Sequence, residues 1–205
     1  MTTTLLQNLD PTNHMMIGEF RHKEGEQFAS VQLSMPVIHF SEPLTTKYGI
    51  NPNFEDNNGR YRLELAVTPE IEEQIMKIED YIQKMFSDYS RHWFKKDKTK
   101  DKFVFSNMLR ATEDGTVLKA KVNKDTMMKI LSEDGNTILQ KEEATIAHVN
   151  RFSKVRPFLQ SHSIWIDTQK RTYGVSLAAK ILLIQPGLQE DAFEDMLLTA
   201  GYTYE

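Results

Sequence analysis

The chain has 205 residues, of which 40% are hydrophobic and 26% are charged, and its formal net charge is −4. This length and composition are typical of a globular protein with one sizeable core or at most two small ones. The absence of cysteine excludes a disulfide framework, a thiolate zinc site and a cysteine nucleophile, and it fits a reducing compartment.

The N-terminal region predicts neither a targeting signal nor an ordered element. The first ten residues lack a basic region followed by an apolar stretch, so we expect no signal peptide. No window along the chain approaches eighteen apolar residues, so no membrane span is expected. Residues 1–27 are expected to form a flexible segment, because the first fifteen are mostly polar and Asp10-Pro11 signals a turn.

Two strands are predicted before a long helix. Residues 28–35 and 61–67 alternate between apolar and polar side chains, which is typical of half-buried strands. In the second strand, Leu63 and Leu65 are expected to face the core while Arg62 faces outward.

One long helix is predicted over residues 69–93. Thr68 is placed to cap it, Pro69 suits its first position, and glutamates follow near the positive end of its dipole. Apolar residues then recur at helical spacing as far as Trp93, which predicts one apolar stripe along about six turns.

After residue 102 apolar residues recur at every second position, which is the spacing of strands. Short strands are predicted over residues 103–109, 117–122, 127–131, 137–139 and 145–149. A final hairpin is predicted from strands 158–167 and 172–184, with residues 168–171 at its tip. Residues 188–200 carry the spacing of a short amphipathic helix. Many short strands with one inserted helix predict a mainly β protein, a small barrel or sandwich that carries a helix, rather than an alternating βαβ chain.

A search for catalytic motifs yields none. The sequence contains no phosphate-binding glycine loop and no HExxH zinc motif, and its six histidines are scattered over different predicted elements. Ser161, His162 and Ser163 are neighbours in sequence, but successive residues of a strand point to opposite faces and cannot form a catalytic pair. We therefore expect no enzymatic activity, no cofactor and no metal.

Positive charge is concentrated in the middle of the chain. Residues 84–124 contain eleven lysines and arginines against five acidic residues, whereas residues 188–205 contain five acidic residues and no basic one. The segment 93–105 combines aromatic residues with a lysine run, a composition suited to phosphates and stacked bases. The alternative is a solvated loop. The lysines of this run are Lys95, Lys96, Lys98, Lys100 and Lys102.

A second set of cations and rings follows in the strand region. Lys119 and Lys121 share one face of a predicted strand, and the predicted hairpin carries an aromatic residue on each arm near its cationic tip. Each has a purely structural alternative: the lysines could form the solvent-exposed face of a strand, and the aromatic residues could be packed in the core. We expect Trp93 and Phe103 to be packed. The further candidates are Arg110, Arg151, Arg156, Trp165, Lys170, Arg171 and Tyr173.

The order of these parts resembles a known family. Residues 43–50 (PLTTKYGI) precede the strand YRLEL, a long helix ends in RHWFKK, and the chain closes with SIWI and YGVSLAAKI. Over residues 30–186 this order is similar to the single-stranded DNA-binding proteins of large DNA viruses. It is more distantly similar to the helix-bearing single-stranded DNA-binding protein of T7-like phages, which has an OB fold.

The resemblance implies an OB-fold-like five-stranded barrel with one inserted helix, additional strands and a C-terminal acidic segment. The barrel domain would span residues 28–187, and residues 188–205 would form an acidic tail or short helix. DNA-binding positions carried over from the family are Trp165, the Lys170–Arg171 turn, Lys95, Lys96 and Arg110. In the phage-type proteins an acidic tail competes with DNA and recruits replication partners, but the helical spacing of residues 188–200 leaves the role of this tail open.

The predicted function is sequence-independent binding of single-stranded DNA in viral DNA replication, recombination or repair, inside an infected cell. Replication proteins bound by the acidic segment and further copies of the chain are candidate partners, and no membrane partner is expected. Three alternatives stay open: a single-stranded RNA-binding OB protein, an assembly module, and an enzyme with a dispersed site.

Overall fold

A computed structural model describes residues 2–23, 25–50, 59–94, 103–132, 134–135, 137–139 and 144–185. The elements in these ranges are β1 (Thr3–Leu5), η1 (Leu6–Asn8), α1 (Pro11–His14), β2 (Met16–Arg21), β3 (Phe28–Ser34), β4 (Val37–His39), β5 (Leu44–Thr46), β6 (Arg60–Ala66), α2 (Pro69–Phe94), β7 (Val104–Ser106), β8 (Leu109–Thr112), β9 (Gly115–Ile130), η3 (Ile146–His148), β10 (Lys154–Gln160), β11 (Ser163–Asp167), β12 (Thr172–Val175) and β13 (Leu177–Gln185).

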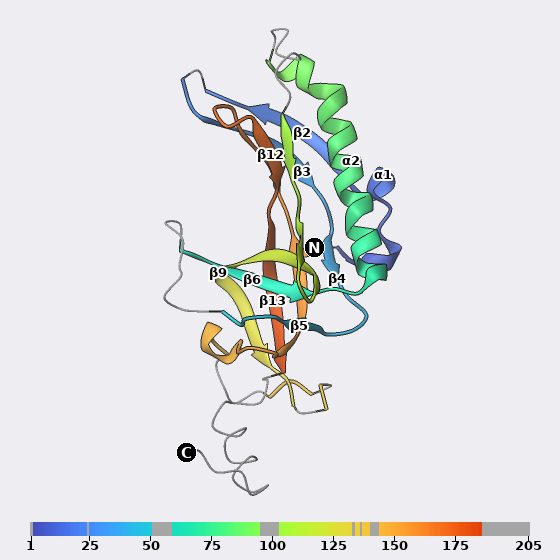
Figure 1. Cartoon of the computed structure of the whole chain (residues 1–205), viewed down its shortest axis with the longest axis vertical. Helices are drawn as coiled ribbons and strands as arrows, with labels where there is room; N and C mark the ends of the chain where they lie inside the picture. Colours follow the sequence, from blue (N-terminus) through green and yellow to red (C-terminus); the bar gives the residue numbers. More distant parts are fainter. Residues whose placement is uncertain are drawn as a thin grey trace, which may run out of the picture.

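Five strands close into a barrel, which occupies the lower half of the view in Figure 1. The order around the barrel is β5, β6, β9, β13 and β10, and pairing of β10 with β5 closes the ring. Only the β13–β9 pair is parallel among these five pairings. Strands β4 and β1 extend this sheet beyond β10, and β8 pairs with β9. The predicted mainly β fold with an OB-like five-stranded barrel, additional strands and one long helix is confirmed.

A second sheet stands above the barrel and has the order β2-β3-β11-β12-β7. It shares one long hairpin with the barrel: β10 pairs with β13 in the lower sheet, and β11 pairs with β12 in the upper one. Each arm of the predicted final hairpin therefore breaks into two strands, at residues 161–162 and at residue 176. The sequence pattern predicted two continuous arms because alternation of side chains does not record a change of sheet.

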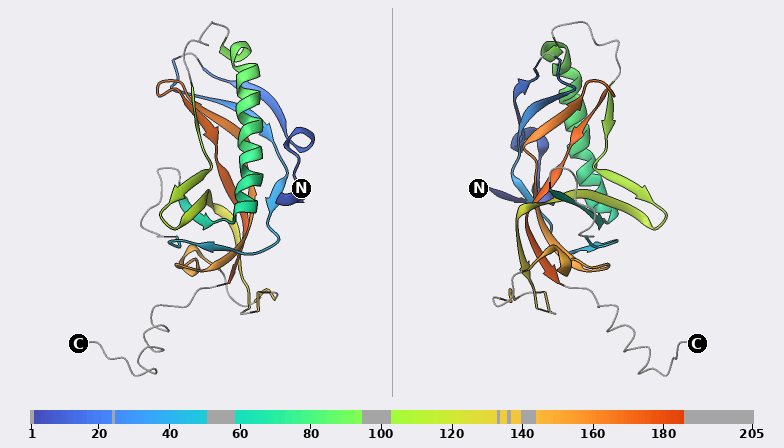
Figure 2. Two further views of the ribbon diagram at one scale, coloured as in Figure 1. Left: turned by 45° about the vertical axis from the view of Figure 1, so that its right-hand side comes forward. Right: turned by 90° about the vertical axis from the view of Figure 1, so that its left-hand side faces the viewer.

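Helix α2 covers one face of the second sheet (Figure 2). It begins where predicted, and Thr68 Oγ1 accepts the Ile71 N–H at 3.4 Å. Phe86 stacks on Tyr173 of β12 with a ring-centroid distance of 3.6 Å, and Trp93 stacks on Phe20 of β2 at 5.8 Å. The expectation that Trp93 packs is confirmed, as is the one for Phe103, which packs against the core.

The expected flexible N-terminal segment of residues 1–27 is wrong for the part that the structure describes. Strand β1 pairs in parallel with β4, and β2 pairs with β3. The reason is burial of a few dispersed apolar side chains: Leu6, Leu9 and Met15 are all buried in the main core. Their irregular spacing has neither helical nor strand periodicity, so the sequence pattern did not reveal them.

Several predicted strands differ from the observed ones for local reasons. The predicted strand 103–109 splits into β7 and β8, because the N–H groups of Met108 and Leu109 are turned toward the Glu79 carboxylate of α2. Residues 117–122 and 127–131 join in the single strand β9, where Thr126 Oγ1 accepts the Asn123 N–H and donates to the Ala179 carbonyl of β13.

Two further predicted strands are not formed as expected, and one segment is not described. Residues 145–149 contain the 3-10 helix η3, in which His148 and Thr145 cap each other, and residues 137–139 contribute only an isolated bridge between Leu131 and Ile138. The predicted C-terminal helix, at residues 188–200, lies outside the described residues.

Glu79 is a buried carboxylate, 4% exposed, on the inner face of α2. Burial raises its pKa above the ordinary value of 4.5, and the N–H groups of Met108 and Leu109 act in the opposite direction. Because its pKa is higher in the folded protein than in the unfolded chain, the folded state holds the proton more tightly. The free energy of unfolding therefore falls as pH rises from 4.5 through the raised pKa.

We predict that Glu79→Gln removes this part of the pH dependence, because the amide keeps a carbonyl acceptor and carries no charge. Glu79→Ala should lower the free energy of unfolding by about 1–3 kcal/mol across the pH range, since it leaves the two N–H donors without their acceptor. Urea unfolding of the three proteins over a pH series tests both effects. Parallel curves for wild type and Glu79→Gln would contradict the pKa assignment.

Candidate functional site

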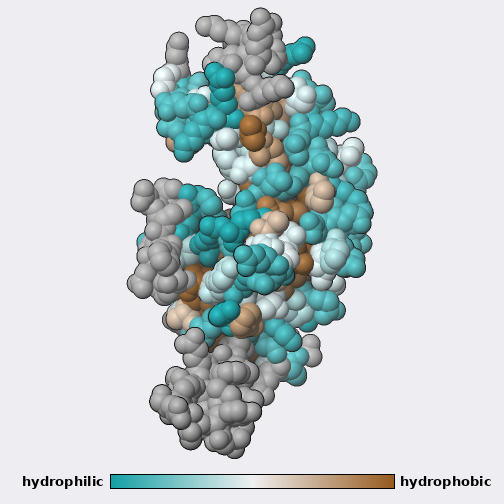
Figure 3. Space-filling model, in the orientation of Figure 1, coloured by the Kyte–Doolittle hydropathy of each residue, from teal (hydrophilic) through white to brown (hydrophobic). Residues whose placement is uncertain are grey.

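A cleft with a volume of about 240 Å³ lies where the barrel meets the second sheet. Figure 3 shows the molecule hollowed between its upper lobe and the barrel, with a pale floor and a hydrophilic rim. The cleft is lined by Arg60, Tyr61, Arg62, Ser106, Asn107, Met108, Lys119, Ala120, Lys121, Trp165, Val175, Ser176 and Leu177. These residues come from β6, β9 and β13 of the barrel sheet and from β7, β11 and β12 of the second sheet. The others lie in the connections between β7 and β8 and between β12 and β13.

The barrel wall of the cleft is a row of cations on β6 and β9. Leu63, Leu118 and Ala120 fill the barrel, so the residues that alternate with them point outward. In the antiparallel register Arg62 lies opposite Lys121. Like charges directly opposite in a sheet are unfavourable, so this wall is electrostatically suited to an anion.

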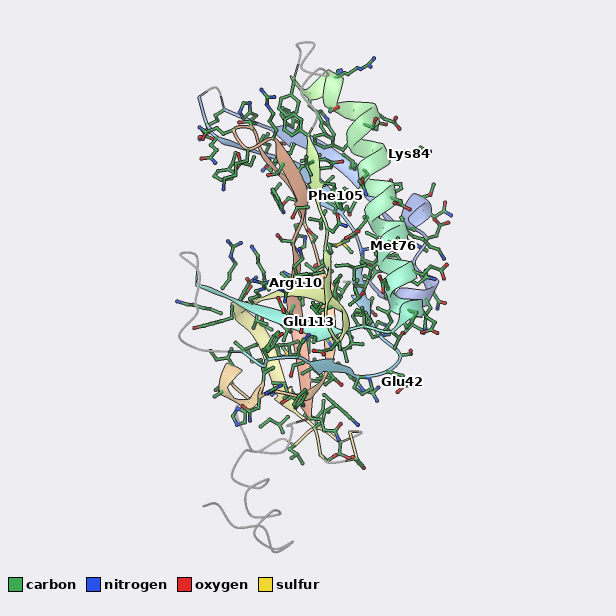
Figure 4. All side chains as sticks on the ribbon, viewed as in Figure 1. Glu42, Met76, Lys84, Phe105, Arg110 and Glu113 are labelled. Carbon is green, nitrogen blue, oxygen red and sulfur yellow. The ribbon has the colours of Figure 1, made fainter. Side chains whose placement is uncertain are left out.

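Glu64 is the carboxylate within this row, and it is buried. Its Oε1 accepts a bond from Arg62 Nη2 at 2.5 Å, and its Oε2 accepts one from Arg110 of β8, which is labelled in Figure 4. The Arg62 and Arg110 side chains remain 61% and 44% exposed, respectively. Glu64 thus holds two guanidinium groups in place while leaving much of their surface to solvent.

Burial and neighbouring positive charge both affect the pKa of Lys119. Burial lowers the pKa of its ammonium group below the ordinary value, and the nearby Arg62 and Arg110 lower it further, against the opposing effect of Glu79 and Glu64. A bound phosphate would counteract this shift, because an anion near Lys119 favours its charged form.

The opposite wall carries the indole of Trp165 on β11. Its neighbours Ile164 and Ile166 face the core, so Trp165 faces outward and is half-buried. It pairs with Gly174 of β12, where an added Cβ would lie 2.9 Å from Trp165 Cζ2 and 2.9 Å from the Ser106 carbonyl oxygen. The ring therefore lies against the backbone at Gly174, in a position that a larger residue would obstruct.

The structure brings together three of the residues expected from sequence, namely Trp165, Lys119 and Lys121. Arg110 reaches the barrel wall through Glu64. Lys170 and Arg171 are exposed at the tip of the hairpin between β11 and β12, on the same strand pair as Trp165.

Other expected residues lie elsewhere. Arg151 is exposed at the opposite end of the long hairpin, with its guanidinium 4.6 Å from the Phe152 ring centroid, and Arg156 is half-buried on β10, opposite Leu183 of β13. The five lysines of the run at residues 95–102 lie outside the described residues: Lys95, Lys96, Lys98, Lys100 and Lys102.

Tyr173 was predicted to bind DNA, and the structure contradicts this because the side chain is buried. Its side chain is only 5% exposed and stacks on Phe86 of α2, on the face of the second sheet opposite to Trp165. A ring buried between sheet and helix is not accessible to a base, so Tyr173 leaves the set of candidate binding residues. The reason is strand periodicity: Gly174 and Tyr173 point to opposite faces, and Gly174 shares the face of Trp165.

Arg60 and Arg62 line the cleft and were missed as site residues. The alternation of β6 does place Arg62 outward, as expected. Nothing in the sequence shows that β6 lies beside β9 in the register that sets Arg62 against Lys121.

Among the described residues, histidines and carboxylates do not gather into a group able to hold a metal ion. In the same part of the chain, α2 and the shorter helices lack the apolar length that crossing a membrane requires.

We predict that Gly174→Ala displaces the Trp165 ring and destabilises the protein by about 1–3 kcal/mol through overpacking. The emission spectrum of Trp165, recorded in a Trp93→Phe background, should change, and urea unfolding measures the loss of stability. Gly18→Ala on β2 is the matched control, because its added Cβ would first meet the flexible end of Gln32. Equal effects of the two substitutions would contradict the packing of Trp165 on Gly174.

Comparisons with known proteins add a distant likeness. The chain matches no family model and no curated protein. Among solved structures it is similar to the crystal structure of gp2.5, a single-stranded DNA-binding protein encoded by bacteriophage T7, with a TM-score of 0.44 and 12% sequence identity. The match covers 93% of this chain and 98% of that chain. At this level of similarity, what the chain binds has to be argued from its own cleft.

Proposed function

We propose that this protein binds single-stranded DNA in the cleft between the barrel and the second sheet, without preference for sequence. One observation carries the proposal: an outward-facing Trp165 and the cations of β6 and β9 line the same cleft. An aromatic ring beside clustered lysines and arginines is the combination that binds single strands, with bases stacked on the ring and phosphates held by the cations.

The preference for single strands follows from stacking. A base can stack on Trp165 only if one of its faces is free, and in a duplex both faces are covered by neighbouring base pairs. Stacking on an aromatic side chain contributes about 1–3 kcal/mol per base, whichever base it is. The ring thus favours unpaired strands and tolerates any sequence.

The cations supply affinity without reading sequence. Contacts to phosphate position a strand but carry no base information. Arg62 and Arg110 are held by Glu64 with much of their surface exposed, so they need little reorganisation to meet a phosphate. Single-stranded RNA offers the same phosphates and ring faces, and it is the main competing ligand.

The proposal is for a binding protein rather than an enzyme. The two buried carboxylates beside the cleft already have structural partners: Glu64 is bonded to Arg62 and Arg110, and Glu79 to the backbone of Met108. The further proposal of a role in viral DNA replication, recombination or repair rests on the order of sequence motifs given above.

We predict that Lys121→Ala weakens binding to all single-stranded DNA sequences about equally. If Lys121 contacts a phosphate, its loss should reduce the slope of log affinity against log salt by about 0.7, the value for one phosphate contact on a single strand. Fluorescence anisotropy titrations of mixed-sequence and oligo-dT strands at several salt concentrations measure both quantities.

Lys84→Ala is the control for this experiment, since Lys84 is exposed on α2, away from the cleft (Figure 4). An equal loss for Lys84→Ala would mean that only the overall charge matters. Absence of wild-type binding at low salt would refute the proposed function.

We predict that Trp165→Ala costs about 1–3 kcal/mol of binding free energy, while Trp165→Phe retains most of the affinity because it keeps a ring. In a Trp93→Phe background, Trp165 emission should change when a single strand binds. The control is Trp93→Phe itself, whose affinity should equal that of wild type because Trp93 packs against Phe20 and Phe86.

Titration with RNA of the same sequence decides between DNA and RNA as the ligand, and tighter RNA binding would favour a single-stranded RNA-binding protein.

A further inference from the structure

The outward face of the second sheet continues from Trp165 toward the hairpin tip. In the register between β11 and β3, Trp165 lies opposite Ser30, and Asp167 lies opposite Phe28. Phe28 therefore shares the face of Trp165 and is its diagonal neighbour toward the tip. It is 59% exposed, a large exposed fraction for a phenylalanine.

Ser30 and Asp167, which are both short, lie between the two rings on this face, and the longer Arg21 of β2 lies opposite Ser30. Ser30 separates them along β3, Thr172 and Gly174 flank them on β12, and Ser106 lies beside Gly174 on β7. The Trp165 ring lies over Gly174 on the β12 side of β11, whereas Phe28 lies on β3, on the other side of β11. The sheet thus presents two separate aromatic surfaces with little between them.

The tip beside Phe28 is held in one conformation by hydrogen bonds. Asp167 accepts the N–H groups of Gln169 and Lys170 at 3.0 and 2.8 Å and the Gln27 side-chain amide at 2.9 Å. Thr168 donates from its backbone and its hydroxyl to the Gln27 carbonyl at 2.9 and 2.7 Å. These bonds tie the cationic tip to the start of β3, next to Phe28.

The electrostatics of Asp167 agree with this arrangement. The Lys170 N–H is the main cause of a lowered pKa for the Asp167 carboxyl, with the Gln27 amide contributing in the same direction. The carboxylate is therefore ionised and bonded to the backbone of the tip, where Lys170 and Arg171 are both exposed.

The spacing of Trp165 and Phe28 in the sheet suits a single strand. Diagonal neighbours on adjacent strands are about 7–8 Å apart, roughly twice the 3.4 Å between nucleotides along one strand of a duplex. Bases of one short single strand can therefore reach both rings, whereas the paired and stacked bases of a duplex are not free to do so.

We propose that Phe28, Lys170 and Arg171 form a second binding subsite, the tip subsite, for the same single strand whose first base stacks on Trp165. Phe28 stacks a further base, and the two cations of the tip bind the adjoining phosphates. This inference rests on the proposed function of the cleft and extends it along the open face of the second sheet.

The test compares Phe28→Ala with wild type on oligo-dT strands from about 4 to about 16 nucleotides, the range of site sizes for an OB fold. Phe28→Ala should bind these strands roughly fivefold to 150-fold more weakly, the equivalent of one lost stacking contact. Binding of thymidine monophosphate, which can stack on only one ring, should change little. Thermal unfolding checks that both proteins are folded.

The matched control is Phe152→Ala. Phe152 is also 59% exposed, but it lies on the turn before β10, at the opposite end of the long hairpin. The Phe152→Ala protein should bind every strand as wild type does.

The results of this experiment distinguish failure of the tip subsite from failure of the cleft. If wild type binds and Trp165→Ala weakens it while Phe28→Ala equals Phe152→Ala at every length, the tip subsite is refuted and the cleft stands. An equal loss for Phe28→Ala on thymidine monophosphate and on the strands also refutes a separate second subsite. If wild type binds no single strand at low salt, the cleft proposal fails and the tip subsite with it.

Discussion

The arrangement of this protein depends on one hairpin that belongs to two sheets. Its arms pair as β10 with β13 in the barrel and as β11 with β12 in the second sheet. Where the arms change sheet, around Ser176, the two sheets cannot pack continuously, and the cleft forms on the outward side of this junction. On the other side α2 spans the junction, with Glu79 bonded to the backbone between β7 and β8.

The period of two in the strands divides the aromatic residues between stability and binding. Tyr173 and Phe105 face α2 and join the aromatic packing around Phe86. Trp165 and Phe28 alternate to the opposite face, where no helix covers them in the described structure. Stacked rings therefore hold the helix on one side of the sheet, while the same residue types are left accessible on the other.

The local sequence pattern was sufficient to predict the elements that are stabilised mainly by a periodic row of buried side chains. Helix α2 was predicted to within one residue at its C-terminal end, because its apolar stripe and its cap are both local. Strands β3 and β6 followed from alternation alone. The β7–β8 break could not be predicted in this way, because it depends on Glu79 of α2. The ordered N-terminal strands could not be predicted either, because they depend on burial of Leu6 and Met15 by distant segments.

The sequence by itself determined which strand faces carry charge, so Lys119, Lys121 and Trp165 could be named as candidates without coordinates. Only the tertiary structure decided which of those faces share one cleft. It added Arg62 through its register with Lys121, removed Tyr173 by burying it, and left Arg151 at the far end of the hairpin. The physical reason is that side-chain direction repeats every two residues along a strand, whereas strand neighbours are chosen by burial of the whole core.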